Sequence, residues 1–81
     1  MLVDPRRLFG VRLIELRKAK GWSQERLALE SGLARSYLGG VERGHRNIAI
    51  VNIMKLAETL EVPPSALLEF SAELQASVAD S

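Results

Sequence analysis

The sequence predicts an all-α fold made of five short helices. Hydrophobic residues recur at helical spacing, as in Phe9, Leu13 and Leu16, and no alternation of apolar and polar residues is long enough for a β-strand. Residues that start or stop helices also separate the apolar segments. The chain has 81 residues, of which 47% are hydrophobic. We therefore expect one small domain over residues 1–81, with a core of its own.

Capping residues set the expected boundaries of the first two helices. Asp4 is a favourable N-cap and Pro5 a favourable first helical residue. Gly21 is a typical stop for this first helix. Ser23 is expected to cap the second helix, which ends at Gly32.

Three further helices are expected, at about residues 35–43, 50–60 and 65–78. Gly44 closes the first of these, and the Pro63-Pro64 pair separates the other two. Helical spacing predicts that one face of the 50–60 helix is buried. That face consists of Ile50, Ile53, Leu56, Ala57 and Leu60.

Composition argues against several classes of protein. The chain has no cysteine, which excludes disulfides and thiolate metal sites. No apolar run approaches the roughly 20 residues that span a bilayer, and the N-terminus lacks the apolar stretch of a secretion signal. We expect a cytoplasmic protein without a membrane partner.

Catalytic and metal-binding patterns are also missing. His45 is the one histidine, and it lies in an expected loop beside Arg46 and Asn47, where a solvated side chain is far more common than a catalytic base. The chain has no glycine-rich phosphate loop after a strand and no Asp/Asn ladder of a calcium site. We expect neither an enzyme nor a bound cofactor or metal.

Charge is unevenly distributed along the chain, although the formal net charge is only +1. Residues 1–48 contain ten Arg and Lys against five Asp and Glu, a net of +5. Residues 49–81 contain one lysine against five acidic residues, a net of −4. The basic half suggests a face for an anionic partner, although ordinary solvated charge explains the pattern equally well.

The second and third predicted helices, at about residues 23–43, have the layout of a helix-turn-helix, since a short glycine-containing turn joins them. On the third helix, Leu38 and Val41 are expected to face the core. The opposite side, which we expect to be exposed, carries Arg35, Ser36, Gly39, Gly40 and Arg43.

The two adjacent glycines require an explanation, because glycine inside a helix costs roughly 1 kcal/mol relative to alanine. One interpretation is clearance: without bulk at Gly39 and Gly40, Arg35 and Ser36 reach base edges in the major groove. Arginine suits this task because two of its donors match O6 and N7 of guanine. The other interpretation is close approach to another helix, which fits Gly40 better than Gly39.

These motifs resemble the Cro/repressor-like (XRE) helix-turn-helix family, whose domains have a compact five-helix, lambda-repressor-like fold. The matching positions are Leu16-Arg17, Gly21, Ser23-Gln24-Glu25, Leu27-Ala28, Gly32 and Leu38-x-x-Val41-Glu42-x-Gly44. A narrower resemblance, over Arg35 to Arg43 and Arg46-Asn47, is to the controller proteins of bacterial restriction–modification systems.

The resemblance implies roles for individual side chains. Arg35 and Ser36 match base-reading positions, and Tyr37 and Arg46 match groove or base contacts. For Tyr37, a partly buried aromatic at the edge of the core is the alternative.

Three further roles follow from the same resemblance. Gln24 matches a phosphate contact at a helix N-terminus, with a solvated glutamine as the alternative, and Asn47 matches a backbone contact. Arg17 and Glu42 match an ion pair between the first and third helices.

The chain departs from the family pattern at expected helix caps. Ala34, Ala49 and Pro63 stand where Ser or Thr is common, and a missing cap costs about 1 kcal/mol. Ala49 and Gly39 also lack hydroxyls that could touch phosphate, so affinity is expected to depend more on arginine.

Apolar residues beyond the needs of the core suggest a homodimer, which would read a palindrome. Val51 and Met54 lie off the core face of the fourth helix. The fifth helix adds a stripe of Leu67, Phe70, Leu74 and Val78, which a small monomer would rarely expose. The alternative is that this helix folds back on its own domain.

We therefore expect a dimeric, sequence-specific transcription regulator in the bacterial nucleoid. The narrower resemblance implies control of its own gene and of a restriction endonuclease gene. The expected partners are double-stranded DNA and a second copy, with RNA polymerase as a further candidate. The alternatives are a phage-type repressor or antitoxin of the same fold, and a helical interaction module without DNA binding.

Overall fold

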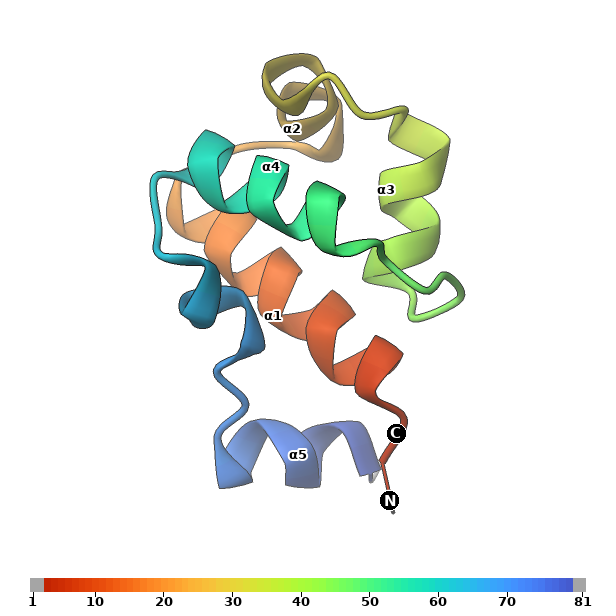
Figure 1. Cartoon of the computed structure of the whole chain (residues 1–81). Helices are drawn as coiled ribbons and strands as arrows, with labels where there is room; N and C mark the ends of the chain where they lie inside the picture. Colours follow the sequence, from red (N-terminus) through yellow and green to blue (C-terminus); the bar gives the residue numbers. More distant parts are fainter. Residues whose placement is uncertain (1–2, 80–81) are drawn as a thin grey trace.

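The computed structural model describes residues 3–79 and is helical, with no strand in that range (Figure 1). Its elements are α1 (Pro5–Ala19), α2 (Gln24–Ser31), α3 (Arg35–Glu42), α4 (Ile50–Leu60), the 3₁₀ helix η1 (Pro64–Leu68) and α5 (Ala72–Ala79). The predicted all-α class is confirmed, and the first four helices lie where the sequence places them. No helix within residues 3–79 is both long and apolar enough to cross a membrane.

The expected capping residues begin and end α1 and α2. The carboxylate of Asp4 accepts a hydrogen bond from the backbone N–H of Arg6 at 2.9 Å and bonds from its guanidinium. These bonds, the side-chain ones first, lower the pKa of Asp4 to about 2. Ser23 Oγ accepts from the N–H of Arg26 at 3.0 Å. Gly32 closes α2 with a φ of 77°, a left-handed conformation that favours glycine.

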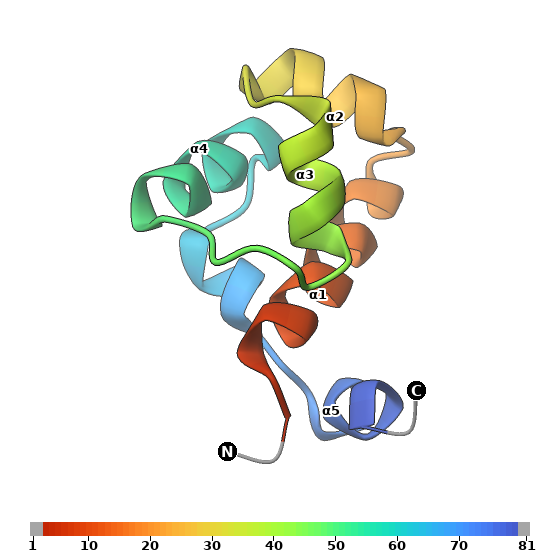
Figure 2. The ribbon, with the colours of Figure 1, turned by 90° about the vertical axis from the view of Figure 1, so that its right-hand side faces the viewer.

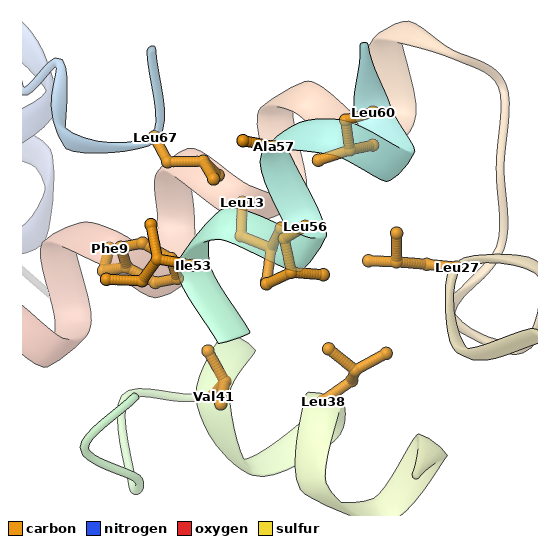
Figure 3. Close-up of a cluster of buried hydrophobic side chains, with 10 residues drawn as sticks. All are labelled: Phe9, Leu13, Leu27, Leu38, Val41, Ile53, Leu56, Ala57, Leu60 and Leu67. Carbon is orange, nitrogen blue, oxygen red and sulfur yellow. The ribbon is translucent and has the colours of Figure 1, made fainter. Parts of the chain in front are cut away.

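The main core lies where α1, α2, α3, α4 and η1 meet (Figure 3). Its ten buried members are Phe9, Leu13, Leu27, Leu38, Val41, Ile53, Leu56, Ala57, Leu60 and Leu67. The helix α3 contributes Leu38 and Val41 to this cluster, and its half-buried Tyr37 packs against it. Its other residues are available for other contacts.

The predicted continuous helix at 65–78 is wrong. The segment forms the 3₁₀ helix η1 and then, after a break at residues 69–71, the separate helix α5. Glu69 is extended, with φ −86° and ψ 90°. Ser71 then starts α5, because its Oγ accepts a hydrogen bond from the N–H of Leu74 at 3.0 Å. The apolar residues on either side of the break therefore do not share one helix face.

The expected exposure of the C-terminal stripe is also wrong for Leu67, Leu74 and Val78, which are buried within the monomer. Leu67 belongs to the main core. Leu74 and Val78 pack with Leu8 in a second, smaller cluster, which Phe70 borders as a half-buried side chain. In both Figure 1 and Figure 2, α5 lies at the amino-terminal end of α1, so the alternative of a helix folded back on its own domain applies.

The expected burial of Ile50 on the core face of α4 is wrong. Helical spacing places Ile50 with the core residues, but the residue is 68% exposed. It lies in the first turn of α4, at the edge of the buried face, and its N-cap Ala49 makes no side-chain capping bond. Ala34 likewise provides no side-chain cap for α3, in agreement with the sequence.

Candidate nucleic-acid interface

The carboxyl-terminal end of α3 lies directly against α1. A Cβ added to Gly10 would stand 2.5 Å from the backbone oxygen of Glu42 and 2.6 Å from that of Val41, far inside van der Waals contact. Gly10 is therefore the glycine that permits a close helix approach. Figure 2 views the molecule from the side of α3 and shows the loop that follows α3 crossing the same face.

Arg17 and Glu42 form the ion pair that the resemblance implies. Arg17 Nε donates to Glu42 Oε2 at 2.8 Å and Arg17 Nη2 donates to Oε1 at 3.1 Å. Arg17 Nη1 also donates to the backbone oxygen of Trp22 at 2.8 Å. Arg17 is 9% exposed and Glu42 is 5% exposed. Because both charges are buried, they fix α3 on α1, and each needs the other.

Gln24 joins this buried pair rather than standing solvated. Its Nε2 donates to Glu42 Oε1 at 2.7 Å, which leaves the second N–H of the amide for another acceptor. Gln24 is the first residue of α2. The bond to Glu42 therefore holds the start of α2 against the end of α3.

Gly39 and Gly40 are buried, so their expected exposure on the outer side of α3 is wrong. A Cβ on Gly39 would lie 3.1 Å from Arg43 Nη1 and 3.7 Å from Gln24 Oε1. A Cβ on Gly40 would lie 2.9 Å from Arg46 Cγ. The two glycines thus give room to long side chains that lie across α3. Neither glycine opens an empty surface, and the atoms nearest to each belong to side chains rather than to the backbone of another helix.

The exposed start of α3 carries Arg35 and Ser36. Arg35 Nε donates to Glu25 Oε1 on α2 at 2.8 Å. Hydrogen bonds from the backbone N–H of Glu25 and, second, from Arg35 lower the pKa of the Glu25 carboxyl. A glutamate is ionised in neutral solution without such bonds, so these bonds favour the charged form further.

The other cations lie at the far end of α3 and in the following loop. Arg43, Arg46 and Asn47 are exposed. Within residues 3–79 the ion pairs involve neither Arg43 nor Arg46. The guanidinium carbon of Arg46 lies 5.9 Å from the centre of the Tyr37 ring, within the range of a cation–π contact.

Tyr37 combines two of the predicted environments. Its side chain is half-buried and packs on the main core, as the alternative for Tyr37 proposed. Its hydroxyl accepts a hydrogen bond from Asn52 Nδ2 on α4 at 3.1 Å, while Arg46 approaches its ring. Tyr37 thus connects the core, α4 and the loop after α3.

Three residues of this region were not identified from the sequence: Glu25, Asn52 and Gly10. No periodic pattern links Glu25 to Arg35 or Asn52 to Tyr37, since both contacts join different helices. Gly10 did carry a signal, because it lies inside α1 and a glycine there is as costly as those in α3.

Two helices joined by a short turn at residues 32–34, with arginine at the start of the second and just after its end, make a helix-turn-helix unit. Within residues 3–79 no group of acidic or histidine side chains is arranged to hold a metal ion. The chemistry of the exposed side chains suits an anionic partner.

A model of the helix-turn-helix family matches residues 13–67, and the chain belongs to that family. The match spans the carboxyl-terminal half of α1 from Leu13, all of α2, α3 and α4, and η1 as far as Leu67. The predicted assignment to the XRE helix-turn-helix class is confirmed.

Controller proteins are among the relatives. The chain is 43% identical over 67 residues to the control protein C.BamHI of Bacillus amyloliquefaciens, across 82% of this chain and 83% of that protein. It is 61% identical to the restriction-modification controller protein C.AhdI from Aeromonas hydrophila, whose crystal structure matches with a TM-score of 0.75 over 76% of this chain and 94% of that one. The narrower resemblance is therefore confirmed.

A solved complex is also similar. The crystal structure of SinR in complex with DNA matches at 37% identity and a TM-score of 0.72, over 75% of this chain and 98% of that one. SinR is a helix-turn-helix transcriptional regulator of Bacillus subtilis.

Proposed function

We propose that the chain binds a palindromic operator as a homodimer and regulates transcription of its own gene and of a restriction endonuclease gene. The observation that carries this proposal is the arginine distribution around α3, with Arg35 at its start and Arg43 and Arg46 at and beyond its end. The 61% identity to C.AhdI supports the link to restriction–modification. Such a regulator would act at the bacterial nucleoid, with RNA polymerase as a candidate partner.

In this proposal α3 enters the major groove with its exposed N-terminal residues toward the bases. Arg35 donates to guanine, and Ser36 lies beside it. Arg46 reaches the groove from the loop, where the half-buried ring of Tyr37 supports its guanidinium.

The remaining side chains contact the DNA backbone. Gln24 keeps one amide N–H for a phosphate at the start of α2, and Asn47 serves the backbone from the loop. Arg43 lies over Gly39. Its positive charge is in none of the ion pairs of the described residues, so it is available for phosphate. Gly39 contributes by leaving space for the Arg43 and Gln24 side chains.

The test is direct binding of purified protein to the DNA upstream of its own gene, measured by fluorescence anisotropy at several salt concentrations. Each neutralised phosphate contributes about −0.9 to the slope of log K against log salt. A dimer with several contacts per subunit should therefore give a steep slope. A flat response between 50 and 200 mM salt, or equal affinity for random DNA, would contradict the proposal.

The proposed dimer interface is the α4 patch, defined as Ile50, Val51 and Met54, which are 68%, 62% and 50% exposed. Leu68 on the adjoining η1 is 52% exposed, and Phe70 lines the same surface hollow as Leu68. So much exposed apolar surface around two packed elements is unusual for a small monomer. A second copy would cover it.

Met54→Asp should convert the dimer to a monomer at micromolar concentration and weaken operator binding. A charge placed in an apolar interface loses its hydration without gaining a partner. Sedimentation velocity measures the assembly state. Leu29→Asp is the matched control, because Leu29 is 78% exposed on α2, outside the α4 patch. If both variants remain dimeric, the α4 patch is not the interface.

A further inference from the structure

The ion pair between Glu25 and Arg35 connects α2 to the first residue of α3, on the proposed DNA face. Arg35 Nε donates to Glu25 Oε1 at 2.8 Å, and the two side chains are 57% and 66% exposed. A carboxylate on a surface that binds a polyanion lowers affinity for every phosphate near it. Its presence there needs a compensating function.

The atoms used in this pair suggest that function. The bond to Glu25 uses the Nε–H of Arg35, while hydrogen bonds within residues 3–79 leave Nη1 and Nη2 unused. The two Nη groups form the end of the guanidinium fork, which matches the O6 and N7 acceptors of guanine. A carboxylate at Nε thus restricts the rotation of a long exposed side chain without occupying its reading edge.

We propose that Glu25 is a positioning residue that sets sequence specificity: it holds Arg35 by Nε so that the Nη fork meets guanine, and it keeps Arg35 away from phosphate. This inference rests on the proposed role of Arg35 in base reading. Pre-ordering lowers the conformational entropy lost when Arg35 binds the correct base.

The chain contains a matched control on the same helix. Arg26 Nε donates to Glu30 Oε2 at 2.8 Å, and these side chains are 51% and 41% exposed. Glu30→Gln removes one charge from α2 and reduces one exposed arginine–carboxylate ion pair to, at most, a weaker hydrogen bond with a neutral amide oxygen, as Glu25→Gln does. Glu30 pairs with Arg26 and not with Arg35. Any effect of Glu25→Gln beyond that of Glu30→Gln comes from Arg35.

The experiment measures the full chain against its operator and against a random duplex of the same length at fixed salt. The readout is discrimination, defined as the Kd for random DNA divided by the Kd for the operator. Glu25→Gln should tighten binding to random DNA and weaken binding to the operator, which lowers discrimination by roughly tenfold per half-site. Glu30→Gln should leave discrimination unchanged.

A double-mutant cycle with Arg35→Ala separates positioning from general electrostatics. In the Arg35→Ala background, Glu25→Gln should not lower discrimination further. Replacing the contacted guanine with 7-deazaguanine, which lacks the N7 acceptor, should weaken wild-type binding more than Glu25→Gln binding. Far-UV circular dichroism checks that each variant stays folded.

Four outcomes would overturn the inference in distinguishable ways. If Glu25→Gln tightens operator and random DNA by the same factor, Glu25 acts only by repulsion. If it tightens the operator more, Glu25 competes with DNA for Arg35. If Arg35→Ala leaves discrimination at the wild-type value, base reading by Arg35 fails and the role of Glu25 fails with it. If Arg35→Ala loses discrimination but Glu25→Gln keeps it, Glu25 does not position Arg35. The proposed function then still holds.

Discussion

Replacing Glu42 with alanine should lower the free energy of unfolding by about 3–5 kcal/mol, since it leaves a buried charge without its partner. Glu42 accepts two hydrogen bonds from Arg17 and one from Gln24. After the change, Arg17 would retain only its bond to the Trp22 carbonyl inside a site that is 9% exposed. Small domains have about 5–15 kcal/mol in total, so the variant should be close to unfolding.

Urea denaturation followed by far-UV circular dichroism measures this loss. Glu15→Ala is the control, because Glu15 also accepts from an arginine, Arg12 Nη1 at 3.1 Å, but its side chain is 50% exposed. An exposed pair of this kind contributes about 0–1 kcal/mol. Equal effects of Glu42→Ala and Glu15→Ala would show that burial of the Arg17–Glu42 pair has no energetic consequence.

A second comparison separates the contribution of the two charges from the contribution of the side-chain volume that they fill. Changing Arg17 to Met and Glu42 to Leu together should cost less than Glu42→Ala alone, because hydrophobic replacement of both charges leaves neither one unpaired. If the double change is the more damaging one, the pair contributes directly to stability. The Arg17–Glu42 pair would then stabilise the fold as well as fix α3 on α1.

The sequence predicted the starts of α1 and α2 and the end of α2 because local chemistry sets these boundaries. Asp4 and Ser23 accept capping bonds, and Gly32 adopts a positive φ. These interactions involve residues a few positions apart, which a sequence reveals directly. The break at residues 69–71 was missed because the spacing of Leu67, Phe70, Leu74 and Val78 fits one helix face as well as two separate elements.

Burial was harder to predict than helicity because it depends on what packs against each face. From the sequence alone, Leu74 and Val78 look like a spare apolar surface, but in the structure they pack in one cluster with Leu8 from the amino-terminal half of α1. Ile50 has helical spacing with the core residues of α4, yet it lies at the edge of that face and is exposed. Periodicity therefore predicts which residues share a helix face, but it does not predict which element packs against that face.

The same limit applies to the candidate site. The sequence identified arginines and small residues on α3, but it did not identify the side chains that contact them. Gly39 and Gly40 were recognised as sites without side chains, while the occupants of that space, Arg43 and Arg46, follow only from the fold. Glu25 lies ten positions before Arg35, on another helix, and their pairing requires the turn between α2 and α3.

Arg35→Ala and Arg46→Ala should each weaken operator binding by about 1–3 kcal/mol per contact, which is about 2–6 kcal/mol for a symmetric dimer. Each should also relax specificity at one base pair of each half-site. Arg35 is exposed at the start of α3, and Arg46 has its guanidinium near the Tyr37 ring. Under the proposed function, each guanidinium makes a bidentate contact with guanine.

The measurement is a binding series of each variant against operators that differ by single base pairs. Arg43→Ala is the comparison, because a phosphate contact should weaken all sequences about equally and reduce the salt slope by about 1 per contact. Arg35→Ala should instead lose its preference at one position and bind random DNA nearly as wild type does. If Arg35→Ala weakens the operator and random DNA by the same factor, Arg35 contacts phosphate. The start of α3 then positions the protein on DNA, and sequence must be read by the loop that carries Arg46.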